Sequence, residues 1–145
     1  MNKFIKLNFI SFFLILIIFG LDRLTKTLIT KKLEVENLIY INDYLNFDLV
    51  WNTGIGFGLL NSEANLFYHI ITFVILIVIS FLIYVSVQTE SYEKLCYSLI
   101  IGGAVGNFFD RAIYYAVPDF IDFHIENFHW FTFNFADISI TIGII

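Results

Sequence analysis

The feature that most constrains this chain is an apolar run from Leu66 to Val87. Its twenty-two residues contain one histidine and no Asp, Glu, Lys or Arg. As an α-helix the run would be about 33 Å long, at about 1.5 Å per residue, which matches the hydrocarbon core of a bilayer. The whole chain has this character, because 59% of its 145 residues are apolar and only 14% are charged. That is too little charge to coat a compact particle in water, so we expect the chain to fold in a membrane.

Four apolar runs predict a transmembrane bundle of four helices. The spans are expected at about 4–21, 66–87, 95–111 and 135–145. The first has Lys3 and Lys6 at its start but no small-residue cleavage site, so it is interpreted as an uncleaved helix and not as a signal peptide. The last is shorter than the roughly 20 residues that a membrane helix needs, which predicts a truncated fourth helix. In the third, Gly102 and Gly106 form a small-xxx-small pair that favours close approach of a neighbouring helix.

Alternating apolar and polar residues predict a small β-sheet on the membrane surface. The alternation covers Leu45 to Leu49 between the first two spans, and Asp122 to Glu126 and Trp130 to Phe135 between the last two. This period of two is typical of half-buried strands. No repeat, low-complexity linker or domain boundary interrupts the chain, so residues 1–145 are expected to form one domain.

The polar residues gather on one side of the membrane. Counting the spans in order places the first and last loops, and the helix ends that flank them, on the same side. That side receives Asp22, Arg23, Lys26, Asn52, Asn107, Asp110, Arg111, Asp119, Asp122, Asn134 and Asp137. Ionisable residues near membrane depth are costly, so their convergence predicts a functional site. Lys and Arg number five on this side and three on the other, which does not decide the orientation once charges paired within the site are set aside.

Two of these acids, Asp119 and Asp137, flank the last loop and could act together on water. In a crevice poor in water two carboxyl groups do not both ionise readily, so one would hold a proton while the other accepts one from water. Each also has a purely structural interpretation. Asp119 could be a solvated loop acid, and Asp137 could face the positive end of a helix dipole. The residues alone leave both interpretations open.

The other polar residues of this side have similar alternatives. Asn107 and Asn134 could orient the aspartates, or they could cap helix ends. Arg111 could fix a substrate carbonyl or an aspartate, or it could reach toward lipid headgroups or pair with a neighbouring acid. The glycine-rich stretch 52–58 lacks the Lys-Ser/Thr of a phosphate loop, so it is predicted to return the chain tightly to the membrane surface.

Several other classes of site are disfavoured. The net charge of −5, with eight Lys and Arg, provides no electrostatic basis for binding nucleic acid. The single cysteine, Cys96, forms no internal disulfide. The segment before the last span contains Asp122, His124, Glu126 and His129. Strand alternation puts His124 and Glu126 on one face but does not place His129, so we favour a hydrated sheet face without a metal.

Five sequence blocks follow one another in a specific order. They are Asp22-Arg23-Leu24-Thr25-Lys26, Asn52-Thr53-Gly54 with Phe57-Gly58, the ten residues from Gly102 to Arg111, Val117-Pro118-Asp119-Phe120, and Phe133-Asn134-Phe135-Ala136-Asp137. Together they resemble the signature blocks of signal peptidase II, the lipoprotein signal peptidase of bacteria, over residues 22–137. The chain departs from the family pattern at two positions outside the acid pair. Arg23 stands where Gln is frequent, and Gly56 stands where Ala is common.

The resemblance implies an aspartyl endopeptidase of the bacterial cytoplasmic (inner) membrane. Its four-helix bundle would carry the small sheet and the active site at the extracytoplasmic face. The family's catalytic pair maps onto Asp119 and Asp137. Its supporting residues map onto Asn52, Gly54, Asn107, Asp110, Arg111, Asn134, Asp22 and Lys26. The implied substrate is a prolipoprotein whose lipobox cysteine carries diacylglycerol and which is cut just before that cysteine; we expect membrane lipids as further partners, a monomer, and no cofactor.

Two other functions stay open from the residues. The first is a small transporter, in which an ion path would be formed by Asp22, Lys26, Asp110 and Arg111. Against it, the spans carry no charged residue in the opposite half of the membrane, so no charged path crosses. The second is a non-enzymatic lipoprotein assembly factor that binds a partner through the sheet, which predicts that Asp119 and Asp137 are dispensable.

Overall fold

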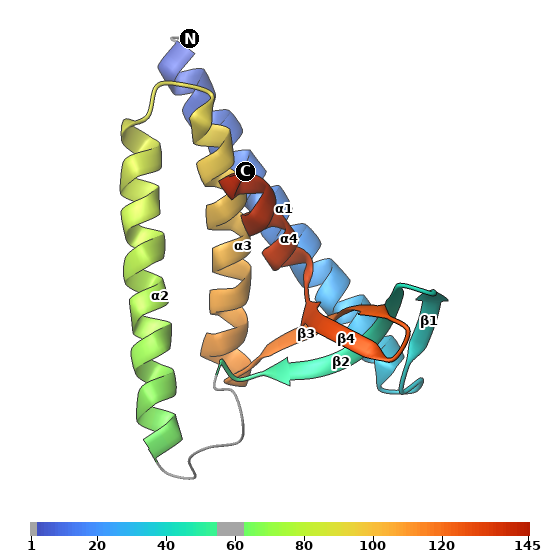
Figure 1. The fold of residues 1–145 in the computed structure, drawn as a ribbon. Coiled ribbons are helices and arrows are strands. Elements are labelled where there is room, and N and C mark those ends of the chain that lie inside the picture. The colour runs from blue at the N-terminus through green and yellow to red at the C-terminus, as the bar shows by residue number, and fades with distance from the viewer. Residues whose placement is uncertain (1–2, 55–62) are drawn as a thin grey trace.

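The structure, a computed structural model, describes residues 3–54 and 63–145 and is mostly helical, with a small antiparallel sheet at one end of the helices (Figure 1). In chain order the elements are α1 (Lys3–Leu33), β1 (Ile39–Asn42), β2 (Leu45–Asn52), α2 (Glu63–Gln88), α3 (Glu93–Tyr114), β3 (Val117–Ile125), β4 (Phe128–Phe133) and α4 (Phe135–Ile144). The tight return predicted at 52–58 lies mainly outside the described residues. Gly56, which departs from the family pattern, lies wholly outside them. The start of α1 and the α2–α3 connection lie at the end of the helices away from the sheet (Figure 1).

The first helix is longer than the predicted span. α1 continues from Lys3 to Leu33, whereas the sequence placed the end of the span at residue 21. Charged residues normally end a membrane segment because they need water. Here Asp22, Arg23 and Lys26 are satisfied by ion pairs, several of them with α3, so the helix does not have to end. The first sequence block therefore lies within a helix.

Two helices of the described part are long and apolar enough to cross a membrane. They are Phe4–Leu33 and Tyr68–Gln88. Most of their side chains face outward, as expected for helices that contact lipid. α3 carries more polar residues, and α4, with 10 residues, is shorter than the roughly 20 that a span needs. Four membrane-crossing helices therefore stay a prediction.

α3 contacts all three other helices and organises the bundle (Figure 1). The predicted glycine pair forms its contact with α1. A Cβ at Gly102 would lie 2.8 Å from Cβ of Ile18, and one at Gly106 would collide with the carboxylate of Asp22. Only glycine allows the two helices to approach this closely, which brings the charges of α1 against α3.

Gly103, on another side of α3, makes the contact with α4. A Cβ there would lie 2.5 Å from the backbone oxygen of Ala136. We expect Gly103→Ala to lower the free energy of unfolding by about 1–3 kcal/mol, because overpacking forces the helices apart. Thermal unfolding in detergent measures this. Gly20→Ala is the control, since no atom lies within 4 Å of its new Cβ; equal midpoints for the two variants would contradict the prediction.

The sheet has the strand order β1-β2-β3-β4, with every neighbouring pair antiparallel. The predicted alternation is confirmed in β2 and β3, while the third predicted stretch is shifted, because Phe135 begins α4. β3 starts at Val117, so Asp119 lies in a strand, opposite Val50 of β2. It is also buried, with 4% of its surface exposed. The interpretation of Asp119 as a solvated loop acid is therefore wrong.

Candidate active site

Asp119 is held by two asparagine side chains. Nδ2 of Asn52, at the end of β2, donates to Oδ2 of Asp119 at 2.8 Å, and Nδ2 of Asn134 donates to Oδ1 at 2.6 Å. Gly54 supports the first of these bonds, since its N–H donates to Oδ1 of Asn52 at 2.8 Å and turns the amide toward the acid. The φ of Gly54 is 73°, a conformation that favours glycine. Both oxygens of Asp119 thus have fixed positions.

Asp137 lies in the first turn of α4, where it completes a capping box. Asn134 is the N-cap residue, and its Oδ1 accepts from the N–H groups of Ala136 and Asp137 at 2.8 and 3.3 Å. Oδ2 of Asp137 accepts from the N–H of Asn134 at 3.0 Å, and Oδ1 accepts from Nδ2 of Asn107 at 2.8 Å. The carboxyl group is thereby oriented by α3 as well as by its own helix.

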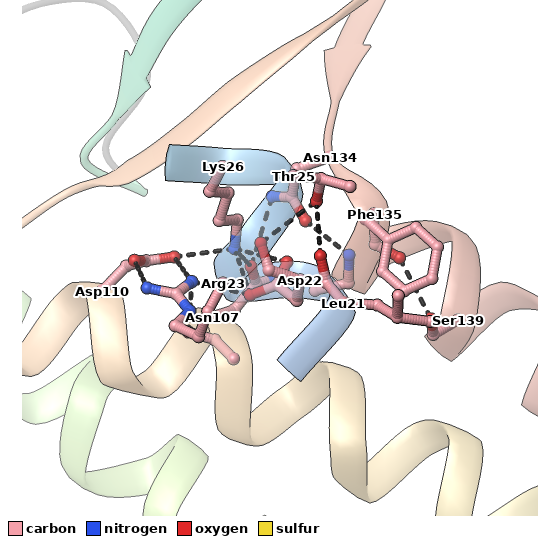
Figure 2. Close-up of polar contacts among 12 residues, drawn as sticks. Leu21, Asp22, Arg23, Thr25, Lys26, Asn107, Asp110, Asn134, Phe135 and Ser139 are labelled. Carbon is pink, nitrogen blue, oxygen red and sulfur yellow. Dashed lines mark hydrogen bonds and ion pairs between the residues drawn. The ribbon is translucent and has the colours of Figure 1, made fainter. Parts of the chain in front are cut away.

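Asn134 joins the two acids. Its side-chain oxygen caps α4, its Nδ2 donates to Asp119, and its backbone N–H donates to Asp137. The residue is fully buried, and Nδ2 also contacts Oδ1 of Asn107 at 3.2 Å. Figure 2 shows Asn134 beside the α1 and α3 side chains. One asparagine therefore fixes the two carboxyl groups relative to each other. Asn134 both caps α4 and orients the two acids, so the two alternatives given by the sequence hold together.

The surroundings favour a proton on Asp119. Burial raises the pKa of Asp119 above its ordinary value, and the nearby charge of Asp137 acts in the same direction. The hydrogen bonds from Asn52 and Asn134 oppose this rise but do not cancel it. Asp137 instead lies at a helix N-terminus, whose dipole favours a negative charge. The two acids thus differ in environment, as acid and base partners require.

This pKa shift predicts how stability depends on pH. The folded chain holds the Asp119 proton more tightly than the unfolded chain, so stability falls as pH rises from the unfolded pKa through the higher folded one. Asp119→Asn removes this titration. We therefore expect the wild-type unfolding midpoint to drop relative to that of Asp119→Asn as the pH rises above about 4, the ordinary pKa of an Asp side chain. Thermal unfolding of both proteins in detergent tests this; a constant or growing wild-type advantage would contradict it.

A cluster of four charged residues, of which Arg23 is half-buried and the other three are buried, lies where α1 meets α3 (Figure 2). Lys26 Nζ is 2.7 Å from Oδ2 of Asp110 and 3.0 Å from Oδ1 of Asp22. Arg23 pairs with both acids, with Nη2 2.6 Å from Oδ2 of Asp22. Two positive and two negative charges neutralise each other where α1 crosses α3. The sequence analysis placed Arg23 among the polar residues of this side, but it did not identify Asp110 as a partner of Arg23.

Lys26 connects this cluster to the acid pair. Its Nζ donates to Oδ1 of Asn107 at 2.8 Å. Because Lys has only donors, the Asn107 oxygen must face Lys26, and the amide Nδ2 then points to Asp137. Lys26 therefore sets the orientation of the amide that positions Asp137.

Arg111 is the candidate site residue whose contacts differ most from those expected from the sequence. Its Nη1 donates to the backbone oxygen of Asn107 at 3.2 Å. Within residues 3–54 and 63–145 it pairs with neither aspartate of the acid pair nor with Asp110, whose carboxylate is bound to Arg23 and Lys26. The interpretation of Arg111 as a partner of a neighbouring acid is therefore wrong. Its Nε is buried and has no hydrogen-bond partner among the described residues.

Apolar cavities lie on both sides of this site. One of about 330 Å³ lies among α2, α3 and α4, and its lining includes Val74, Val78, Ile100, Ile140, Asn107 and Arg111. A second of about 260 Å³ reaches Asp137 between Phe131, Phe133 and the outer face of α4. Such walls suit hydrocarbon, while the buried polar groups suit a peptide. The arrangement can therefore bring a lipid-bearing chain to two acids able to activate water.

Two solved structures, both described as bacterial membrane enzymes, resemble this fold. One has a TM-score of 0.76 and 30% sequence identity, with 92% of this chain and 86% of the other covered. The second has a TM-score of 0.71 and 31% identity, with 92% and 82% covered. Apolar helices that face outward, a buried Asp119 and a half-buried Asp137 bridged by Asn134, and this fold together define a membrane enzyme.

The particular family is shown by sequence comparison. The family model described as signal peptidase (SPase) II matches residues 14–145. The lipoprotein signal peptidase of Pelagibacter ubique is 46% identical, with 99% of this chain and 89% of the relative covered. That of Thermodesulfovibrio yellowstonii is 43% identical, with 94% and 88% covered. The chain belongs to the signal peptidase II family, which confirms the resemblance of the five blocks.

Proposed function

We propose that this membrane peptidase removes signal peptides from prolipoproteins whose lipobox cysteine carries diacylglycerol, and cuts just before that cysteine. Family membership supports signal-peptide removal, because the relatives are named lipoprotein signal peptidases. It favours an enzyme over a small transporter or a non-enzymatic assembly factor. The observation that carries the chemistry is the bridge formed by Asn134, which binds Asp119 and Asp137 at once.

In the proposed mechanism Asp119 and Asp137 are the catalytic residues, and each has one role. Asp137, at the N-terminus of α4, accepts a proton from water and directs the oxygen to the carbonyl carbon before the cysteine. Asp119, whose pKa is raised by burial, gives its proton to the carbonyl oxygen. The product of this step is a tetrahedral gem-diol, and neither a metal nor a nucleotide is needed to form it.

Breakdown of the gem-diol completes the hydrolysis. The protonated Asp137 gives its proton to the amide nitrogen, and Asp119 takes a proton back from one hydroxyl. The carbon–nitrogen bond then breaks, which leaves a carboxyl group on the signal peptide and an amine on the lipidated cysteine. The acids return to their starting protonation states, so atoms and charge balance over the cycle.

The surroundings of the acids suit this substrate. The cavity among α2, α3 and α4 has aliphatic walls for an acyl chain and ends at Asn107 and Arg111. The unpartnered Nε of Arg111 offers a hydrogen bond to a peptide carbonyl there. Asp22, Lys26 and Asp110 support the site indirectly, through the orientation of Asn107. We therefore propose that Arg111 binds substrate while these three charges position the acid pair.

We also propose how the chain lies in the membrane. All four helices would cross or enter the bacterial cytoplasmic membrane, with the sheet and the acids at the extracytoplasmic surface. The placement of the sheet at the membrane surface is supported by its exposed aromatic residues, because aromatic side chains prefer the interface between membrane and water. These residues are Trp51, Phe128, Trp130 and Phe131. We propose that the chain acts as a monomer. Membrane lipids would be its remaining partners.

The test is a cleavage assay with the purified chain in detergent and a synthetic prolipoprotein peptide. We expect one cut before a cysteine that carries diacylglycerol, and loss of most of the cleavage when the same peptide lacks the lipid. Mass spectrometry of both fragments locates the cut. Absence of cleavage, or equal cleavage of the two peptides, would overturn the proposed substrate class.

A further inference from the structure

A second polar cluster lies on the sheet, apart from the acid pair. Asp122 and His124 are on β3, and His129 is on β4. Oδ2 of Asp122 is 2.7 Å from Nδ1 of His129 and 3.5 Å from Nδ1 of His124. One ligand atom from each residue lies within 4.8 Å of the other two. Strand alternation puts Asp122 and His124 on the face of β3 opposite to Asp119, so this cluster is separate from the proposed catalytic site.

The β3–β4 hairpin explains why these side chains converge. Glu126 adopts a positive φ of 53° in the turn, and the register then places His129 directly opposite His124. Directly opposed residues of antiparallel strands project to the same face. The two imidazole rings are stacked, with their centroids 5.2 Å apart. The pairing of His124 with His129 depends on the register between β3 and β4. Alternation within one strand does not reveal this register, so the sequence analysis could not place His129.

Two buried atoms of this region lack a partner. His124 is only 7% exposed, and its Nδ1 has no hydrogen-bond partner among the described residues. The same holds for Oδ1 of Asn46, which lies opposite Asp122 in the register between β2 and β3. A buried polar atom without a partner costs about 1–3 kcal/mol. A bound cation would satisfy Nδ1 of His124, which the hydrogen bonds of the described side chains do not.

We propose that Asp122, His124 and His129 bind a divalent transition-metal ion of the Zn²⁺ type. Two imidazoles and one carboxylate are a common ligand set for Zn²⁺, with water in the fourth position. Bonds of about 2 Å in a tetrahedron place ligand atoms about 3.3 Å apart, close to the 3.5 Å between His124 and Asp122. His129 must move slightly outward, and its side chain is free to do so because it is 56% exposed.

The bound ion would cross-link β3 and β4. β4 leads directly into Asn134 and α4, so the ion would restrain the segment that carries one partner of the acid pair. This role is structural, and it does not depend on the proposed hydrolysis. Cleavage of a lipopeptide without any Zn²⁺ effect, or Zn²⁺ binding without cleavage, would therefore separate the two proposals.

The test uses the purified full chain in detergent, freed of any affinity tag and treated with a chelator. Titration with Zn²⁺, followed by calorimetry and thermal unfolding, should give one ion per chain and a higher unfolding midpoint. His129→Gln and Asp122→Asn should each weaken binding by at least about tenfold. Co²⁺ serves as a second probe, because its visible spectrum reports ligand number.

The control is His69→Gln, which removes the histidine on α2 and should leave Zn²⁺ binding unchanged. His129 is exposed, so His129→Gln should fold normally and give a readable result. If the wild-type chain binds no Zn²⁺, or if His129→Gln and Asp122→Asn bind it as tightly as wild type, the proposed site is wrong.

Discussion

Asp119→Asn and Asp137→Asn should each reduce cleavage of a diacylglyceryl-modified lipobox peptide by at least about 10²–10⁴-fold. Each change keeps the side-chain volume but removes a group that must gain or lose a proton in the proposed cycle, and that is the range over which a positioned acid or base contributes. Both oxygens of each acid accept hydrogen bonds, so the new NH2 group meets one donor, and the folding of each variant is measured together with its rate. Initial rates at saturating substrate measure the effect.

Asp43→Asn is the matched control for these variants. It makes the same substitution in the turn between β1 and β2, where Asp43 is exposed and bonded to Tyr40, and we expect wild-type rates. Far-ultraviolet circular dichroism and elution volume confirm that each variant folds. A folded Asp119→Asn or Asp137→Asn chain that cleaves at the wild-type rate would show that this pair does not catalyse the reaction.

The arrangement of the chain could largely be predicted because it follows from periodicity and from the order of the spans. The uninterrupted run at 66–87 corresponds to α2, and alternation at Leu45 to Leu49 corresponds to part of β2. The glycine spacing in α3 indicated a close helix contact, which the structure places against α1. What failed was the end of α1. Whether Asp22 and Arg23 stop a helix depends on partners more than eighty residues away, and local patterns do not contain them.

The site was harder to predict because neighbouring residues on a helix point in different directions. Asp110 and Arg111 are adjacent, which suggested a pair, but side chains at i and i+1 do not face each other. Asp110 instead meets Arg23 and Lys26 of α1. The order of the spans grouped Asn107 and Asn134 with the two acids, whereas the donor and acceptor directions of their side chains follow only from the three-dimensional contacts.

Lys26→Met should lower the free energy of unfolding by about 3–5 kcal/mol, which is typical of removing one partner from a buried set of charges. The methionine keeps the length of the apolar stem but leaves Asp22 and Asp110 close together with only Arg23 to neutralise them. It also removes the shorter of two hydrogen bonds to Oδ1 of Asn107, the other coming from Asn134, so cleavage should fall even at temperatures where the variant is folded. Thermal and denaturant unfolding in detergent measure the first effect, and the peptide assay measures the second.

Lys32→Met on the same helix is the matched control for Lys26→Met. Lys32 is exposed near the end of α1, so its replacement should change stability by no more than about 0.5 kcal/mol. The comparison separates the loss of a buried ion pair from the general effect of replacing lysine with an apolar residue. Similar stabilities for Lys26→Met and Lys32→Met would mean that Asp22 and Asp110 are not held as charges by Lys26, and that the orientation of Asn107 has another cause.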